Sequence, residues 1–345
     1  MLLQKHFMDA LAAKATELRV LEFSDMYDLA APVFENIYSL QHLTRLDLSL
    51  CDLWRELLYP VEGLCSRLAQ LSRLKHLVME LRGATNVHLP PDFSQLQALT
   101  HLALSGLADC SRALSPLTRL KDLRLEYFED TLHVPSDLNG LQNLTCLRFG
   151  GSHVRLGGHA DQLSRLIGMR HLVLEDCMEL GLSTAAFSSA LRGLKELQYF
   201  GAMWLDAQID VTALYPMYGL SALTKLELAH VGLHNFTCSD AWQNLQHLLL
   251  RQNLLQCLPA KLTCLSALVH LDVSFQLDTF QLAGPLDCWK FMPGLCIINL
   301  QQRPCRPVTH GCDNIAYWSE MSARFLSDAR EQTGAATSSN IAIIS

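Results

Sequence analysis

Histidine is the side chain most often used to bind metal ions and to transfer protons at neutral pH, and five histidines recur at one position of a repeated pattern. They are His76, His101, His171, His247 and His270. Two pairs, His76 with His101 and His247 with His270, fall on consecutive predicted strands, which lie about 4.8 Å apart in a sheet. Each pair has the spacing for a metal ion, but no Asp or Glu lies beside both members to complete a typical metal shell. We expect exposed imidazoles beside aliphatic strands and no metal site.

A second candidate for metal chemistry lies near the C-terminus. Residues 305–312 contain Cys305, His310 and Cys312. They lack the C-x-x-C pair of most zinc sites, and a fourth ligand would have to come from Cys296 or Cys288. We interpret this stretch as a structural loop. Cysteines inside the repeats are expected to be small apolar fillers or surface thiols: Cys65, Cys146 and Cys264.

Motifs for catalysis and for cofactor binding are missing from the sequence. It contains no G-x-S-x-G nucleophile turn and no H-E-x-x-H helix. Gly150-Gly151 and Gly157-Gly158 are not followed by the G-K-[ST] of a phosphate-binding loop. Carboxylates are scattered over many predicted strands, so no acid/base pair stands out. We therefore predict that the protein is not an enzyme and uses no cofactor and no small-molecule substrate.

The elements that position these side chains are short strands marked by the pattern L-x-x-L-x-L. Twelve units carry it, at spacings of 21 to 31 residues. The first positions are Leu18, Leu43, Leu74, Leu99, Leu120, Leu144, Met169, Leu197, Leu223, Leu245, Leu268 and Leu295. Leucines two residues apart point to one face of a strand, and a single unit cannot bury that face alone. Successive units must therefore stack and share one core.

The unit that begins at Leu245 is the most regular, with Asn253 after the strand and Leu258-Pro259 at the start of the return segment. On these residues the chain resembles the leucine-rich repeat family, over about residues 18–300. The resemblance implies an α/β solenoid (horseshoe) of about twelve repeats, with a parallel concave sheet and a convex side of short helices or irregular turns. The family places an Asn after each strand to bond the backbone of neighbouring turns, and only Asn253 fits.

Two longer units resemble the cysteine-containing repeat type of F-box-linked and ribonuclease-inhibitor-like proteins, because Cys51 and Cys177 replace the Asn. Their return segments, Val61–Leu71 and Thr184–Leu194, are predicted to be helices from the spacing of their apolar residues. The other units resemble the shorter plant/algal-like type. Leu107, Phe128, Leu205 and Val231 occupy the Asn position in four of them.

The ends of a stacked array need caps. Residues 1–17 are predicted to form an N-terminal capping helix, and 18–302 the solenoid. Residues 303–330 are predicted to form a C-terminal cap with a helix, and 331–345 a disordered tail. We find no signal peptide and no stretch of about 18 apolar residues that would span a membrane.

Composition limits the classes of partner. The net charge is −7, which argues against a nucleic-acid ligand because phosphate binding needs an excess of Lys and Arg. The twelve cysteines, without an export signal, favour reduced thiols in the cytoplasm, with a cilium axoneme or the cytoskeleton as the alternative location. We expect no membrane partner.

A mixed surface of charged and aromatic residues on the predicted sheet is the candidate site. Tyr, Trp and Arg are the residue types most common at interface hot spots. The candidate partner-binding residues are Arg124, Tyr127, Arg148, Glu175, Tyr199, Trp204, Glu227, His230, Arg251 and Phe275. The sequence therefore predicts a non-catalytic module or scaffold that binds a protein partner on its repeat surface.

Two narrower hypotheses stay open. One is the substrate-recognition part of an F-box type ubiquitin-ligase adaptor, although no F-box-like domain precedes Leu18. The other is an axonemal or cytoskeletal scaffold.

Overall fold

The computed structural model describes the repeats but not every loop between them. The described residues are 17–23, 37–49, 61–80, 89–106, 111–126, 132–133, 138–150, 154–155, 163–177, 188–189, 191–205, 217–259, 261–276, 280, 292, 294–300 and 342–344. The chain divides into two compact units, residues 1–197 and 198–345. Each unit is described by itself.

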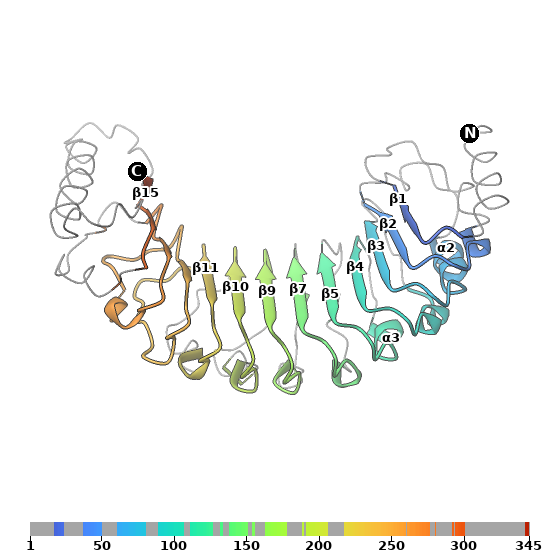
Figure 1. Ribbon diagram of the computed structural model, residues 1–345, viewed down its shortest axis with the longest axis horizontal. Coiled ribbons are helices and arrows are strands. Elements are labelled where there is room, and N and C mark those ends of the chain that lie inside the picture. Colours follow the sequence, from blue (N-terminus) through green and yellow to red (C-terminus); the bar gives the residue numbers. More distant parts are fainter. Residues whose placement is uncertain are drawn as a thin grey trace. The chain divides into compact units, whose positions relative to one another are not determined.

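The first unit contains one parallel sheet with its strands in chain order (Figure 1). They are β1 (Val20–Glu22), β2 (Arg45–Leu48), β3 (His76–Glu80), β4 (His101–Ser105), β5 (Asp122–Glu126), β7 (Cys146–Gly150) and β9 (His171–Glu175). A separate parallel pair is formed by β6 (Leu132–His133) and β8 (Val154–Arg155).

The second unit also contains parallel strands in chain order. They are β10 (Tyr199–Met203), β11 (Lys225–Ala229), β12 (His247–Leu249), β13 (His270–Asp272), β14 (Ile297–Asn299) and β15 (Ala342–Ile344). Every one of the twelve predicted repeats therefore contributes a strand, and β15 is an additional strand that the repeat pattern does not include.

The repeated leucines align across neighbouring strands and form the core. Leu46, Leu77, Leu102 and Leu123 are register partners on β2 to β5, and each is at most 2% exposed. In the second unit Leu226, Leu248 and Leu271 are aligned in the same way and fully buried. Side chains between the leucines lie on the opposite side of each sheet, here called the sheet face.

Return segments carry the chain back between strands through short helical turns. In the first unit these are η2 (Ile37–Ser39), α2 (Val61–Leu68), η3 (Pro91–Gln95), α3 (Ser111–Leu114) and η4 (Leu138–Gly140); in the second, η7 (Leu262–Cys264). Figure 1 shows α2 and α3 on the side of the first unit opposite its strands. The helix predicted over Val61–Leu71 is thus confirmed as α2, which ends three residues earlier, at Leu68. Of the helix predicted over Thr184–Leu194, the structure describes only the last part, in which residues 188–189 and 191–192 are helical.

Several expected segments lie outside the described residues. These are the N-terminal capping helix before Glu17, the C-terminal cap over 303–330 with its Cys305–Cys312 stretch, Cys51, and the tail except for Ala342–Ile344 in β15. Within the part of the chain that is described, no helix is long and apolar enough to cross a membrane.

Candidate functional site

Asn253 holds consecutive repeats together just after β12, as the sequence predicts. Its side chain is 3% exposed. Its Nδ2 donates to the backbone oxygens of Leu228 (2.6 Å) and Leu250 (2.8 Å), and its Oδ1 accepts from the N–H groups of Val231 (3.1 Å) and Leu233 (3.2 Å). One amide therefore satisfies four buried backbone groups, three of them in the preceding repeat.

The same position is occupied by two other polar residues. Gln276, which the sequence analysis did not identify, is buried after β13 and bonds Leu250 O (2.7 Å) and Leu255 N (3.1 Å). In the first unit the Cys177 thiol, predicted to stand at this position, lies near Phe149 O (3.8 Å) and Glu175 O (3.4 Å). The position of Gln276, 23 residues after Asn253, was the signal that could have identified it.

The residue just before this position has a left-handed backbone in successive repeats. Its φ is 56° at Trp204, 54° at His230, 57° at Gln252 and 54° at Phe275 in the second unit, and 52° at Asp176 in the first. This conformation is uncommon for residues other than glycine. The side chains of Trp204, His230, Gln252 and Phe275 follow the ends of β10 to β13, and we call them the strand-end row.

Backbone hydrogen bonds between repeats hold the strand-end row in place. The N–H of Trp204 donates to Ala229 O (2.9 Å), that of His230 to Arg251 O (3.1 Å), and that of Gln252 to Ser274 O (2.9 Å). Each acceptor is the residue before the next member of the row, so one geometry repeats along the unit. Residues held in such strained conformations often belong to functional sites.

Two members of the row form an exposed aromatic contact. Trp204 stacks on His230, with ring centroids 4.4 Å apart and planes at 27°. Trp204 is 41% exposed, and among the described residues of the second unit it is the only large apolar side chain that is exposed. His230 is also exposed, and Phe275 is half-buried. A Trp that stays in solvent although aromatic burial is favourable is a candidate contact for another molecule.

Glu227, expected to be exposed, is instead buried, so that part of the candidate site is corrected. It is 5% exposed on β11. Its carboxylate accepts from Tyr199 Oη (2.9 Å) and pairs with Lys225 Nζ (3.0 Å) and Arg251 Nη2 (3.1 Å). The three neighbours cover the carboxylate, and their pairing with it offsets the free-energy cost of its desolvation. Glu227 therefore positions the side chains around it.

Tyr199 reaches Glu227 because Gly201 leaves space on β10. Gly201 is the register partner of Glu227 on β11. A Cβ atom on Gly201 would lie only 2.9 Å from the Tyr199 hydroxyl, so the phenol ring lies along its own strand over the glycine. Lys225 Nζ lies 4.3 Å from the centre of this ring, a cation–π contact. Tyr199, Glu227, Lys225 and Arg251 thus form one connected cluster beside the strand-end row.

The candidate residues in the first unit form a different group. Arg148 on β7 pairs with Glu126 (2.9 Å) and with Glu175 on β9, and Arg124 on β5 pairs with Asp122 (3.1 Å). All of these are ion pairs on the sheet face. Tyr127 lies outside the described residues. Of the ten candidates, Arg124, Arg148 and Glu175 belong to the first unit, and Tyr199, Trp204, Glu227, His230, Arg251 and Phe275 to the second.

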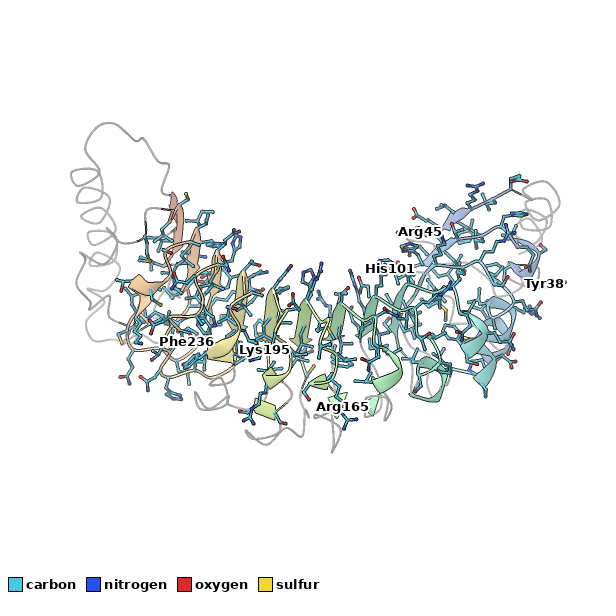
Figure 2. All side chains as sticks on the ribbon, turned by 60° about the horizontal axis from the view of Figure 1, so that its bottom comes forward. Tyr38, Arg45, His101, Arg165, Lys195 and Phe236 are labelled. Atoms are coloured by element: carbon cyan, nitrogen blue, oxygen red, sulfur yellow. The ribbon has the colours of Figure 1, made fainter. Side chains whose placement is uncertain are left out.

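A hollow of about 540 Å³ lies over β2 to β5 on the sheet face of the first unit. Arg45 and His101 of its lining lie on the strand side of the unit in Figure 2, whereas Arg165 lies at the turns. The rings of His76 and His101 are stacked 4.1 Å apart at 16°. Partial burial is the largest cause of a lowered pKa at His76, and the nearby His101, Arg45 and Lys75 lower that pKa further.

The other histidine pair is arranged differently. His247 and His270 meet edge to face, with ring centroids 5.9 Å apart. Partial burial lowers the pKa of His270, against the opposing effect of Asp272. Among the described residues no three His, Cys, Asp or Glu side chains come together as metal ligands.

Burial favours the protonated thiol at three of the described cysteines. It raises the pKa of Cys146 to about 11 and that of Cys177 to about 12, and it raises the pKa of Cys238 strongly. Because the thiolate is the nucleophilic form, these groups are poorly suited to nucleophilic chemistry at neutral pH.

No protein-family model and no curated protein matches the chain. It is similar to the solved structure of an internalin from Listeria monocytogenes, with 18% identity, coverage of 88% of this chain and 91% of the internalin, and a TM-score of 0.58. It is also similar to the plant peptide hormone receptor RGFR1 in complex with RGF2 (18% identity, 85% and 49% coverage, TM-score 0.50). The Arabidopsis receptor kinase HAESA, in complex with the peptide hormone IDA and the co-receptor SERK1, gives 20% identity, 75% and 42% coverage, and a TM-score of 0.50.

Proposed function

Because the chain has the leucine-rich repeat fold, we propose that it is a non-catalytic module that binds a protein partner through the strand-end row and the adjoining sheet face of its second unit. The observation that carries the proposal is the strand-end row, in which a stacked, exposed Trp204 is held in a left-handed conformation. Peptide complexes of two receptors with the same fold support it by analogy.

The chemistry of the row and of the cluster beside it is that of an interface. Trp204 and Tyr199 supply large apolar area with few rotatable bonds, and Arg251 supplies directional donors. Glu227 fixes Tyr199 and Arg251 before any partner arrives, which lowers the entropy lost on binding.

Truncation of the exposed aromatic side chain tests this proposal. We expect Trp204→Ala to weaken binding of the partner by about tenfold or more, as is typical for an interface Trp. The wild-type chain would first be used to purify partners from native extract. The affinity of each purified partner for the wild type and the variant would then be measured by calorimetry.

Ile167→Ala is a matched control, because Ile167 is 67% exposed and lies between strands of the first unit. It removes exposed apolar area away from the proposed site, so affinity should not change. Partner affinity that is unchanged in Trp204→Ala and also in the double variant with Tyr199→Ala would contradict the proposal. The identity of the partner would separate a ubiquitin-ligase role from an axonemal one.

A further inference from the structure

The charges next to the strand-end row are arranged with the cations outward. Side chains of Arg251 and Lys225 are 44% and 34% exposed, whereas that of Glu227 is 7% exposed beneath them. Asp272 is buried as well, where it accepts from the Ser274 N–H (2.9 Å) and hydroxyl (2.6 Å) and from Asn299 (3.3 Å). An approaching molecule therefore meets cationic heads, although the formal charges of this group cancel.

Other charged residues of the described second unit do not change this picture. Asp240 and Lys261 form an ion pair of their own (2.8 Å) on the return segments, away from the strands. His230, His247 and His270 add no negative charge to the face. The complementary ligand group is thus an anion, and the guanidinium of Arg251 favours a planar carboxylate.

Dimensions of the row set the length of the segment that fits. From Trp204 to Phe275 the row crosses three strand intervals of roughly 4.8 Å, or about 14 Å. An extended peptide rises about 3.3 Å per residue, so four or five residues span it. Arg251 follows β12, about one and a half intervals from the middle of the Trp204–His230 stack, which corresponds to about two peptide residues.

We propose that the partner presents an extended segment of about five residues across the ends of β10 to β13, with an aromatic residue on the Trp204–His230 stack and an Asp or Glu two residues away that pairs with Arg251. This inference rests on the proposed function and specifies its partner. The aromatic contact supplies most of the affinity, and the carboxylate sets the register and the rate of association.

Selection from a phage library of random seven-residue peptides against the full chain tests the proposed motif. Enriched peptides should contain an aromatic residue two positions from Asp or Glu, and their binding should be lost in Trp204→Ala. Enrichment of basic or purely apolar sequences, or of none whose binding depends on Trp204, would overturn the inference.

A double-mutant cycle on the best peptide tests the carboxylate–Arg251 contact. By fluorescence anisotropy, Arg251→Gln and replacement of the peptide Asp by Asn should each weaken binding about fivefold to tenfold. The two changes together should weaken it hardly more than either alone, since they remove one interaction. Lys261→Gln, which removes an exposed cation on the return side, should leave the affinity unchanged.

Additive effects in that cycle, or an unaffected Arg251→Gln variant, would refute the contact. The outcomes separate the two proposals. If a natural protein partner depends on Trp204 but no acidic–aromatic peptide binds, the function stands and this inference fails. If nothing binds in a Trp204-dependent manner, both fail.

Discussion

At the scale of single residues, the buried amide of Asn253 has a structural role that the residues at the same position of most other repeats cannot have. Asn253 bonds four backbone groups of two repeats, while most other repeats have an apolar or sulfur-bearing side chain at that position. Val231 and Leu205 are simply buried there. The repeat containing β12 is therefore tied more firmly to its predecessor than those that lack an amide.

Asn253→Ala should lower the free energy of unfolding by roughly 3 kcal/mol, because it leaves several buried donors and acceptors unpaired. Urea unfolding followed by circular dichroism measures this. Asn244→Ala is the matched control: its exposed amide donates one hydrogen bond, to Ser221 O (3.0 Å), so the loss should stay below about 1 kcal/mol. Equal losses in the two variants would show that the buried amide is not special.

At the scale of elements, stacking of the return segments sets a steric limit. Gly193, in the turn that follows the helical residues 191–192, faces the backbone of the preceding turn, and a Cβ atom there would overlap the carbonyl oxygen of Ser164. At Gly140 of η4, a Cβ atom would lie only 2.4 Å from the carbonyl oxygen of Ser115, which is closer than a Cβ atom can approach. Close approach of neighbouring repeats thus depends on glycine at this point of the turn.

Gly193→Ala should destabilise the protein by about 2 kcal/mol or more, since backbone must move to admit the methyl group. Gly168→Ala serves as the comparison, because nothing lies within 4 Å of a Cβ atom at Gly168. That change should be close to neutral in thermal unfolding. A Gly193→Ala variant with the melting temperature of Gly168→Ala would disprove the steric argument.

At the scale of the whole molecule, each unit contains a partly buried histidine with a lowered pKa: His76 in the first and His270 in the second. The fold favours the neutral ring, so the unfolded chain binds more protons at pH values between the folded and the ordinary pKa. This contribution to stability is present above the ordinary pKa of about 6.5 and is lost as the pH falls through the folded pKa.

We expect the wild type to lose stability between about pH 7.5 and pH 5, and the double variant His76→Gln with His270→Gln to lose less. Urea midpoints at the two pH values measure the difference. His234→Gln is a suitable control, because it removes a solvent-exposed histidine. Parallel pH profiles for wild type and double variant would contradict the assignment to these two rings.

The sequence by itself determined the repeat, the strands and the core. Leucines two residues apart specify a strand face locally, and twelve such faces bury one another only by stacking. It also identified Asn253 and the aromatic residues after the strands. The tertiary structure decided which side chains face solvent: Glu227 is buried because Tyr199, Lys225 and Arg251 from three consecutive repeats converge on it. The left-handed row and the amide of Gln276 likewise depend on the backbone groups that register places opposite them, and a pattern within one repeat contains no information about that register.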